Sequence, residues 1–174
     1  MGSSLCQLQR SEISRILFHV SSFFFVYGSH LMQIFSQLQQ SSEIIQLLKV
    51  ATTIAIVGLS PKENRPSNMV GRYLISTGYT VYPINPGQNE ILGLKCYPNL
   101  DALPFPADII NIFRRSEEVM KIVEEVLALK NLPKALWMQQ GIRNETAAGL
   151  AKKQGIFVVM DRCIKIDHEN LIRR

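Results

Sequence analysis

The chain has few of the residues that build covalent or metal-based sites. Its 174 residues include only three cysteines, Cys6, Cys96 and Cys163, and no C-x-x-C pair occurs among them. Widely separated cysteines of odd number indicate neither a disulfide framework nor a zinc site, so a reducing compartment is the default expectation. The three histidines likewise lack the spacing of metal ligands. Metal catalysis is therefore not expected.

The glycine-rich nucleotide fingerprints are also missing. A dinucleotide loop needs G-x-G-x-x-G and a P-loop needs G-x-x-x-x-G-K-[ST], and the chain contains neither. Its first apolar run, residues 54–57, is followed by the single Gly58. The second run ends in Asn85-Pro86, where a dinucleotide fold would carry an acidic residue for a ribose hydroxyl. NAD and ATP are therefore disfavoured as ligands.

Positive charge exceeds negative charge only slightly. The formal net charge is +5 and the pI is about 9.2, with the basic residues scattered along the chain. A nucleic-acid binder more often clusters Lys and Arg on one face with a pI well above 9. The balance favours a small anionic ligand, and no nucleic-acid partner is expected.

Residues 1–40 differ in composition from the rest, being rich in Ser and Gln with an apolar block at 23–27. One interpretation is an amphipathic transit-type leader or weak secretory signal, with Arg10 and Arg15 nearby. The other is a remnant of a cloning vector. Both place 1–40 outside the fold and 41–174 in the domain. The apolar stretch is shorter than the roughly 18–20 residues of a spanning helix, so no membrane partner is expected. A cytoplasmic location follows, or an organelle if the leader is real.

From residue 41 on, short apolar runs alternate with amphipathic stretches. The runs are rich in β-branched residues and end at Gly, Pro, Ser or Asn, which indicates strands buried in a parallel sheet. The expected strands are 54–57, 80–84, 108–113, 135–138 and 156–160, and the expected helices are 68–77, 116–127 and 144–153. Alternating strands and helices predict a Rossmann-like, three-layer α/β fold with a five-stranded, mainly parallel sheet. The tail, 167–174, is expected to form a short solvated helix.

The loop after the first strand carries the clearest ligand signal. Gly58 permits close backbone approach and Ser60 supplies a hydroxyl, while Lys62 and Arg65 add positive charge. Asn68 is expected to begin the next helix, whose amino-terminal amides attract phosphate. The alternative interpretation is a solvated turn shaped by Gly58. Because open α/β sheets bind ligands at the carboxyl edge, this loop and the one at Asn85 predict the site.

A resemblance adds to this interpretation. Segments spread over residues 41–168, in order and with matching spacing, resemble the small stand-alone CoA-binding proteins, which are similar to the CoA-binding domain of the succinyl-CoA synthetase α subunit. The segments are I-A-I-V-G-L-S, R-P-S-N-M-V-G-R-Y-L, G-Y-T-V-Y-P-I-N-P, I-L-G-L-K-C-Y-P-N-L, A-D-I-I-N-I-F-R-R, A-L-W-M-Q-Q-G-I-R-N-E and V-V-M-D-R-C-I-K-I. The resemblance implies a Rossmann-like fold with coenzyme A or an acyl-CoA as the small-molecule partner.

Carried onto this chain, the resemblance implies contacts from four loops. Those to the phosphates come from Gly58, Ser60, Lys62 and Arg65, those on the adenosine side from Asn85 and Pro86, and the others from Phe113, Arg114, Arg115, Gln140 and Gly141. The residue chemistry agrees: Arg114 and Arg115 suit bidentate phosphate pairing, Phe113 offers a flat apolar face, and Gln140 can bond an amide of the pantetheine arm. For Arg115 and Phe113 the alternatives are a surface charge and a core aromatic.

Catalysis is not the favoured interpretation. An acyl-CoA ligase needs a phosphorylatable histidine and an ATP-binding domain, and no histidine occurs between His30 and His168. The expected role is a non-catalytic carrier, sensor or regulator, with a homodimer as one arrangement. One rival is an enzyme that handles acyl-CoA or thiols through Cys163, whose thiolate Arg162 would favour, although a buried inert cysteine is commoner. The other is a nicotinamide-dependent oxidoreductase on the same fold. Asp161 is expected to orient Arg162 or to cap a turn.

Overall fold

A computed structural model describes residues 32–35 and 37–172. The chain divides into two compact units, residues 1–44 and 45–174. In the first unit, 32–35 and 37–44 are helical, and the expectations for a leader and for the apolar block at 23–27 concern residues outside the described ones. The proposed boundary between 40 and 41 stays a prediction. Among the described helices, none combines the length and apolarity that a membrane crossing requires.

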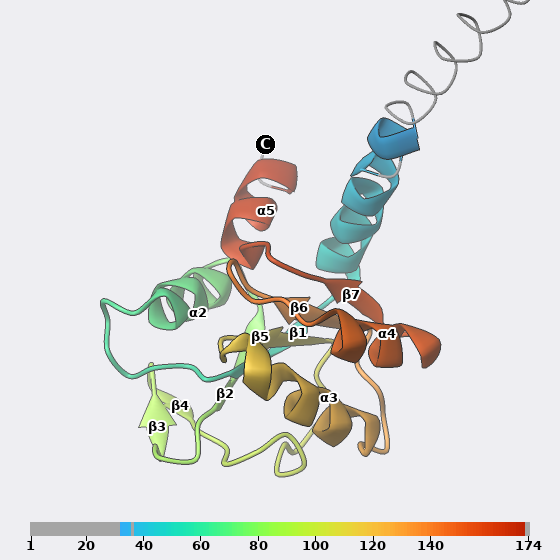
Figure 1. The fold of residues 1–174 in the computed structure, drawn as a ribbon. Helices are drawn as coiled ribbons and strands as arrows, with labels where there is room; N and C mark the ends of the chain where they lie inside the picture. Colours follow the sequence, from blue (N-terminus) through green and yellow to red (C-terminus); the bar gives the residue numbers. More distant parts are fainter. Residues whose placement is uncertain (1–31, 36, 173–174) are drawn as a thin grey trace, which may run out of the picture. The chain divides into compact units, whose positions relative to one another are not determined.

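The second unit contains the five-stranded parallel sheet expected from the sequence (Figure 1). Its strands are β1 (Thr53–Val57), β2 (Thr80–Ile84), β5 (Ile109–Ile112), β6 (Ala135–Met138) and β7 (Phe157–Val159). They lie in the order β2-β1-β5-β6-β7, and every neighbouring pair is parallel. A small antiparallel pair, β3 (Glu90–Ile91) and β4 (Leu94–Lys95), follows β2. The predicted fold class is confirmed.

Helices lie on both faces of the sheet because consecutive strand residues point to opposite sides. Residues 45–50 of this unit are helical. The later helices are α2 (Pro66–Ser76), α3 (Val119–Leu127), α4 (Glu145–Lys153) and α5 (Ile164–Leu171), and a 3₁₀ turn at Ser116–Glu118 precedes α3. Ala55 and Val57 of β1 join one buried cluster with the apolar faces of α3 and α4. On α2, a Cβ at Gly71 would lie 3.6 Å from Cδ1 of Ile56, so α2 packs closely against the opposite face of β1.

Helix α2 begins earlier than the sequence predicted. Its first residue is Pro66, and Arg65 before it has an extended backbone, with φ −87° and ψ 140°. Proline suits a first helical position, because its fixed φ matches the helix and its missing N–H would have had no partner there. The expectation that Asn68 opens the helix is therefore wrong. Asn68 lies inside the first turn and is 1% exposed.

The carboxyl-terminal helix also differs from its expectation, because α5 is not solvated on all sides. Asp167 and His168 are both buried. The guanidinium of Arg162 donates two hydrogen bonds of 2.7 Å to the carboxylate of Asp167. The ring of His168 lies edge-to-face against Tyr73 and Tyr79. A buried acid with a bidentate partner is compatible with a core position, and sequence pattern alone does not reveal such pairing.

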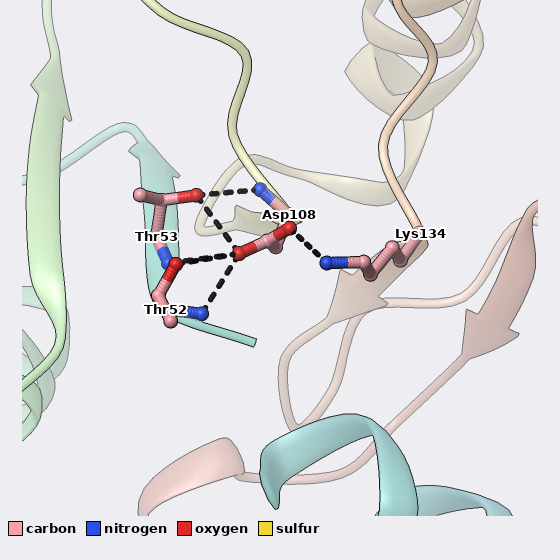
Figure 2. Close-up of polar contacts among 4 residues, drawn as sticks. All are labelled: Thr52, Thr53, Asp108 and Lys134. Atoms are coloured by element: carbon pink, nitrogen blue, oxygen red, sulfur yellow. Dashed lines mark hydrogen bonds and ion pairs between the residues drawn. The ribbon is translucent and has the colours of Figure 1, made fainter. Parts of the chain in front are cut away.

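The amino edge of the sheet is fastened by one carboxylate (Figure 2). Oδ2 of Asp108 accepts hydrogen bonds from the amides of Thr52 and Thr53, at 2.8 and 3.1 Å, and from both hydroxyls. Oδ1 of Asp108 accepts from the ammonium of Lys134. Burial acts to raise the pKa of Asp108, but Lys134 and the threonine donors outweigh it and hold that pKa well below its usual range. The cluster joins the starts of β1, β5 and β6 at the edge opposite the loops considered next.

Candidate functional site

The strand order places a crevice at the carboxyl edge between β1 and β5. From β1 the chain crosses through α2 to β2 on one side, whereas β5, β6 and β7 follow on the other. The loops that leave β1 and β5 therefore diverge, and ligands of open α/β sheets bind at such a switch point. The residues involved are Gly58 and its successors after β1, and Phe113 to Arg115 after β5.

At the switch point the two loops touch through Gly58. Gly58 has φ +88°, and a Cβ at this position would lie 2.7 Å from the carbonyl oxygen of Phe113. The same Cβ would be 3.2 Å from Nε of Arg114, so the Arg114 side chain lies against the Gly58 backbone. Glycine is required here both for the positive φ and for the close approach. Gly58 of the β1 loop and Arg114 of the β5 loop are thus neighbours.

The loop after β1 is held by its own side chains against the start of α2. The amide of Ser60 donates to Oγ of Ser67 at 3.1 Å, and Nδ2 of Asn68 donates to the Ser60 carbonyl at 2.8 Å. The Ser60 hydroxyl accepts from the amide of Lys62 at 3.2 Å. These bonds fix the backbone of residues 60–62 beside the positive end of the α2 dipole, where an anion is favoured.

The cations around this crevice differ in whether they are paired. Lys62 and Arg65 are exposed, Arg114 is partly buried, and no ion pair holds any of the three within the described ranges. Arg115 is instead 3.5 Å from Oε2 of Glu118 through its Nε. Of the two arginines that the sequence offers for phosphate pairing, Arg114 thus lies at the switch point, with no carboxylate of the described residues in an ion pair with it.

The loop after β2 is tied to the same crevice. Nδ2 of Asn85 donates to the carbonyl of Leu59 at 2.9 Å, and Oδ1 of Asn85 accepts from the amide of Gly87 at 3.1 Å. The thiol of Cys96 donates to the Asn85 carbonyl at 3.4 Å. Burial raises the pKa of the Cys96 thiol. Asn85 therefore links the β2 loop to the β1 loop and fixes both.

A cavity of about 410 Å³ opens beside these loops. Its wall is apolar where the strand ends and Pro98 meet it, and charged where the start of α3 meets it. Its lining comprises Val57, Ile84, Pro86, Pro98, Asn99, Leu100, Arg114, Glu117, Glu118, Lys121, Ile122 and Glu125. Two residues singled out from the sequence, Pro86 and Arg114, therefore share one cavity. Phe113, Gln140 and Gly141 do not line it.

The turn after β6 forms a separate part of the edge. Gln140 and Gly141 are exposed, and Gly141 has φ +81°. Below them, Nε2 of the buried Gln139 donates to Oδ1 of the buried Asn111 at 2.8 Å. The Gly141 amide donates to Oδ1 of Asp161 at 2.7 Å, so Asp161 caps this turn and Asp167 orients Arg162.

The end of β7 brings Cys163 to the same edge. Cys163 is partly exposed and precedes the first residue of α5. Its neighbour Arg162 has its guanidinium engaged by Asp167 and its carbonyl bonded by Nε1 of Trp137 at 2.7 Å. Among the described residues, no group of three or more His, Cys, Asp or Glu side chains is arranged to hold a metal ion.

Sequence reasoning assigned no side-chain hydrogen bond to four polar residues at this edge: Ser67, Asn68, Asn111 and Gln139. Asn111 carried a signal, since it interrupts the apolar run I-I-N-I of a buried strand. A buried amide there needs a partner, and only the fold shows that Gln139 provides it. Oδ1 of Asn68 and Nδ2 of Asn111 are buried without a hydrogen-bond partner in the part of the chain that is described.

Comparison with known proteins decides the family. Residues 52–169 match the family described as CoA binding domain, which is more than half of the chain. The chain belongs to the CoA binding domain family. The resemblance expected from the sequence is thereby confirmed, and the matched residues run from just before β1 to α5.

This CoA binding domain is similar to proteins of two kinds, small proteins of about its own length and much longer ligases. The uncharacterized protein YneT of Bacillus subtilis is 41% identical over 127 residues, which are 73% of this chain and 93% of YneT. The ADP-forming acetate–CoA ligase I of Archaeoglobus fulgidus is 30% identical over 109 residues, 63% of this chain but only 16% of the ligase. A solved structure of a hypothetical protein from Pyrococcus horikoshii has a TM-score of 0.72 and 35% identity, and the match covers 76% of this chain and 92% of that one.

Proposed function

We propose that this protein binds coenzyme A or an acyl-CoA at the carboxyl edge of its sheet and acts as a carrier, sensor or regulator without catalysing a reaction. The observation that carries the proposal is the contact between Gly58 and Arg114 at the switch point of a CoA binding domain. That contact brings the backbone of the β1 loop next to the Arg114 side chain, and the same loop is hydrogen-bonded to the first turn of α2. Family membership supplies the ligand class.

In the proposed pose the phosphates lie at the β1 loop. Gly58 gives backbone access, Ser60 offers its hydroxyl, and Lys62, Arg65 and Arg114 neutralise the charge. Within the described residues none of these three cations is in an ion pair, which favours a multiply charged anion over a neutral ligand. Arg115, which faces Glu118, would contribute less unless it moves.

The two ends of the ligand are proposed to diverge from this point. The adenosine side lies toward Asn85 and Pro86, where the cavity of about 410 Å³ has an apolar wall suited to a flat base. The pantetheine arm runs the other way, past Phe113 to Gln140 and Gly141. From β1 to β6 are two strand spacings, about 10 Å in all, which an extended pantetheine arm can span.

Isothermal titration calorimetry against CoA, acetyl-CoA, dephospho-CoA, NAD and ATP tests the ligand class. We expect CoA or acetyl-CoA to bind with a micromolar-range dissociation constant, worth about 8 kcal/mol. Absence of a heat signal with CoA and acetyl-CoA up to millimolar concentration would overturn the proposal. Binding of NAD without CoA would favour the nicotinamide-dependent alternative.

A charge-reversal pair tests the pose. The double variant Lys62→Glu/Arg65→Glu is expected to weaken CoA by about 10- to 100-fold through loss of two charged contacts. The matched control is Lys152→Glu/Lys153→Glu, which makes the same charge change on exposed residues in the last turn of α4. That turn leads into the start of β7, at the opposite edge of the sheet. A larger loss for CoA than for dephospho-CoA would assign Lys62 and Arg65 to the 3′-phosphate, and equal losses would assign them to the diphosphate.

A further inference from the structure

The turn after β6 combines a rigid base with an exposed tip. Its base is Gln139, which is 3% exposed and donates to the fully buried Asn111 at 2.8 Å. Its tip is Gln140 and Gly141, both exposed. Within the described residues, no hydrogen bond or ion pair engages the Gln140 side-chain amide, so its donors and its acceptor can all serve a ligand.

Asp161 clasps this turn from the neighbouring strand end. Oδ1 of Asp161 accepts from the Gly141 amide at 2.7 Å, and the Asp161 amide donates to the Ile142 carbonyl at 3.3 Å. Oδ2 of Asp161 lies 3.6 Å from Nη1 of Arg143. The carboxylate therefore connects the tip of the turn to the end of β7 and is itself partly neutralised.

The backbone conformation of Asp161 restricts which residue types fit at this position. Asp161 has φ +56°, a conformation that L-residues other than Asn and Asp seldom adopt. Glycine would fit the backbone more easily but could not accept from Gly141. An aspartate in the left-handed region, bonded across to a glycine at φ +81°, supplies both the backbone shape and the acceptor.

We propose that Asp161 is a positioning residue for the part of the ligand beyond the phosphates. By fixing the Gly141 amide, Asp161 holds Gln140 with its amide presented at the carboxyl edge, ready for an amide group of the pantetheine arm. Pre-organisation of this kind raises affinity because the turn loses less freedom on binding. The inference rests on the proposed function and deepens it.

Three variants separate the acceptor from the backbone effect. Asp161→Asn keeps an acceptor oxygen and tolerates positive φ, Asp161→Gly relieves the backbone but removes the acceptor, and Asp161→Ala loses both. Each is titrated with CoA and with adenosine 3′,5′-bisphosphate, which lacks the pantetheine arm. Thermal unfolding of each variant reports whether the fold is retained, and Asp161→Gly keeps the test decisive if Asp161→Ala does not fold.

We expect Asp161→Gly to weaken CoA by about 5- to 20-fold, and Asp161→Asn by no more than about threefold, because one charge-assisted hydrogen bond is lost or replaced. Adenosine 3′,5′-bisphosphate should bind all folded variants like the wild type. CoA binding by Asp161→Gly at wild-type strength would overturn this inference while leaving the proposed function intact, and so would equal losses for both ligands. Failure of the wild type to bind CoA would overturn both.

Discussion

The carbonyl oxygen of Phe113 occupies the space that a side chain on Gly58 would need, 2.7 Å from the position of its Cβ. This contact lies where β1 and β5 end side by side, and it is supported by the Phe113 amide, which donates to the Val57 carbonyl at 2.8 Å. Backbone contacts therefore fix the positions of the loop after β1 and the loop that carries Arg114 relative to each other. Side-chain chemistry at the site depends on these positions.

Replacing Gly58 tests this relationship directly. Gly58→Ala is expected to cost about 2–4 kcal/mol of unfolding free energy, since positive φ and a backbone clash act together. Gly78→Ala is the matched control, because Gly78 has φ +95° but a Cβ there would meet no atom within 4 Å. Denaturant unfolding should show a loss of only about 1–2 kcal/mol for the control. Equal losses in the two variants would mean that the Phe113 contact is unimportant.

CoA affinity should also fall more in Gly58→Ala than in Gly78→Ala. We expect Gly58→Ala to weaken CoA by about tenfold or more, equivalent to roughly 1.4 kcal/mol, because displaced Phe113 carries Arg114 away from the crevice. Gly78→Ala should leave CoA affinity unchanged, since Gly78 lies between the end of α2 and the start of β2, at the amino edge of the sheet. Calorimetry on both folded variants measures the difference.

The strands and the sheet were predictable because a parallel sheet imposes a strong pattern on sequence. β1 and β6 are buried along nearly their whole length, so they appear as uninterrupted apolar runs that end where the backbone reaches solvent. Element ends were less predictable. α2 starts at Pro66 rather than Asn68 because a proline at the first position competes with a side-chain cap, and the pattern does not say which prevails.

The site was predictable only in outline. Loop composition and the resemblance pointed to Gly58, Ser60 and Arg114, which stay predictions, but they could not show that Arg115 faces Glu118 or that Asn111 reaches Gln139. These partners are far apart in sequence or depend on side-chain direction. The buried face of α5 was missed for the same reason, since the sequence pattern suggests a solvated charge at Asp167 and does not reveal its pairing with Arg162.

The hydrogen-bond cluster around Asp108 should make the free energy of unfolding sensitive to acid. A carboxyl group whose pKa is lower in the folded protein than in the unfolded chain stabilises the fold above the unfolded pKa, near 4, and that contribution is lost as the pH falls toward the folded value. Wild-type stability is therefore expected to fall below about pH 4. Asp108→Asn should lower stability at pH 7 by about 2–4 kcal/mol, because Lys134 and four threonine donors lose a charged partner.

Urea unfolding at pH 7, 4 and 3 measures this effect. The gap between wild type and Asp108→Asn should narrow as the pH falls, because the wild-type carboxylate progressively loses its advantage. Asp101→Asn is a suitable control, since Asp101 is exposed and no ion pair involves it among the described residues. A gap that stays constant from pH 7 to pH 3 would contradict the assigned role of Asp108.

Tyr79 should make the free energy of unfolding fall at high pH, opposite to the acid sensitivity due to Asp108. Its hydroxyl donates to the Leu48 carbonyl at 2.7 Å, and burial, with a smaller effect from Tyr73, raises the pKa of Tyr79 to about 12. The stabilisation is complete below the unfolded pKa, about 10, and is lost as the pH rises toward 12. Tyr79→Phe should cost about 0.5–1.5 kcal/mol at pH 7 and show a smaller decline between pH 10 and about 12. Thermal unfolding across this range tests it, and parallel declines would exclude Tyr79 as the cause.

The two described cysteines should differ sharply in reactivity. The thiolate is the reacting form, and Cys96 is buried with a raised thiol pKa and a hydrogen bond to the Asn85 carbonyl, whereas Cys163 is partly exposed. At pH 7.5 we expect iodoacetamide to modify Cys163 at least about tenfold faster than Cys96, as judged by peptide mass spectrometry. Cys163→Ser identifies the fast site, and Cys96→Ser should leave its rate unchanged.

Ligand protection then connects this difference to the proposed site. Cys163 follows β7 at the carboxyl edge, next to the turn at Gly141, so a CoA whose pantetheine arm reaches that turn should slow modification of Cys163 and leave Cys96 unaffected. Adenosine 3′,5′-bisphosphate, which has no arm, should not protect. Protection of Cys163 by both ligands would mean that the arm is not what covers it. If saturating CoA gave no protection, the arm would have to end before β7, and the proposed pose would be confined to the loops of β1, β2, β5 and β6.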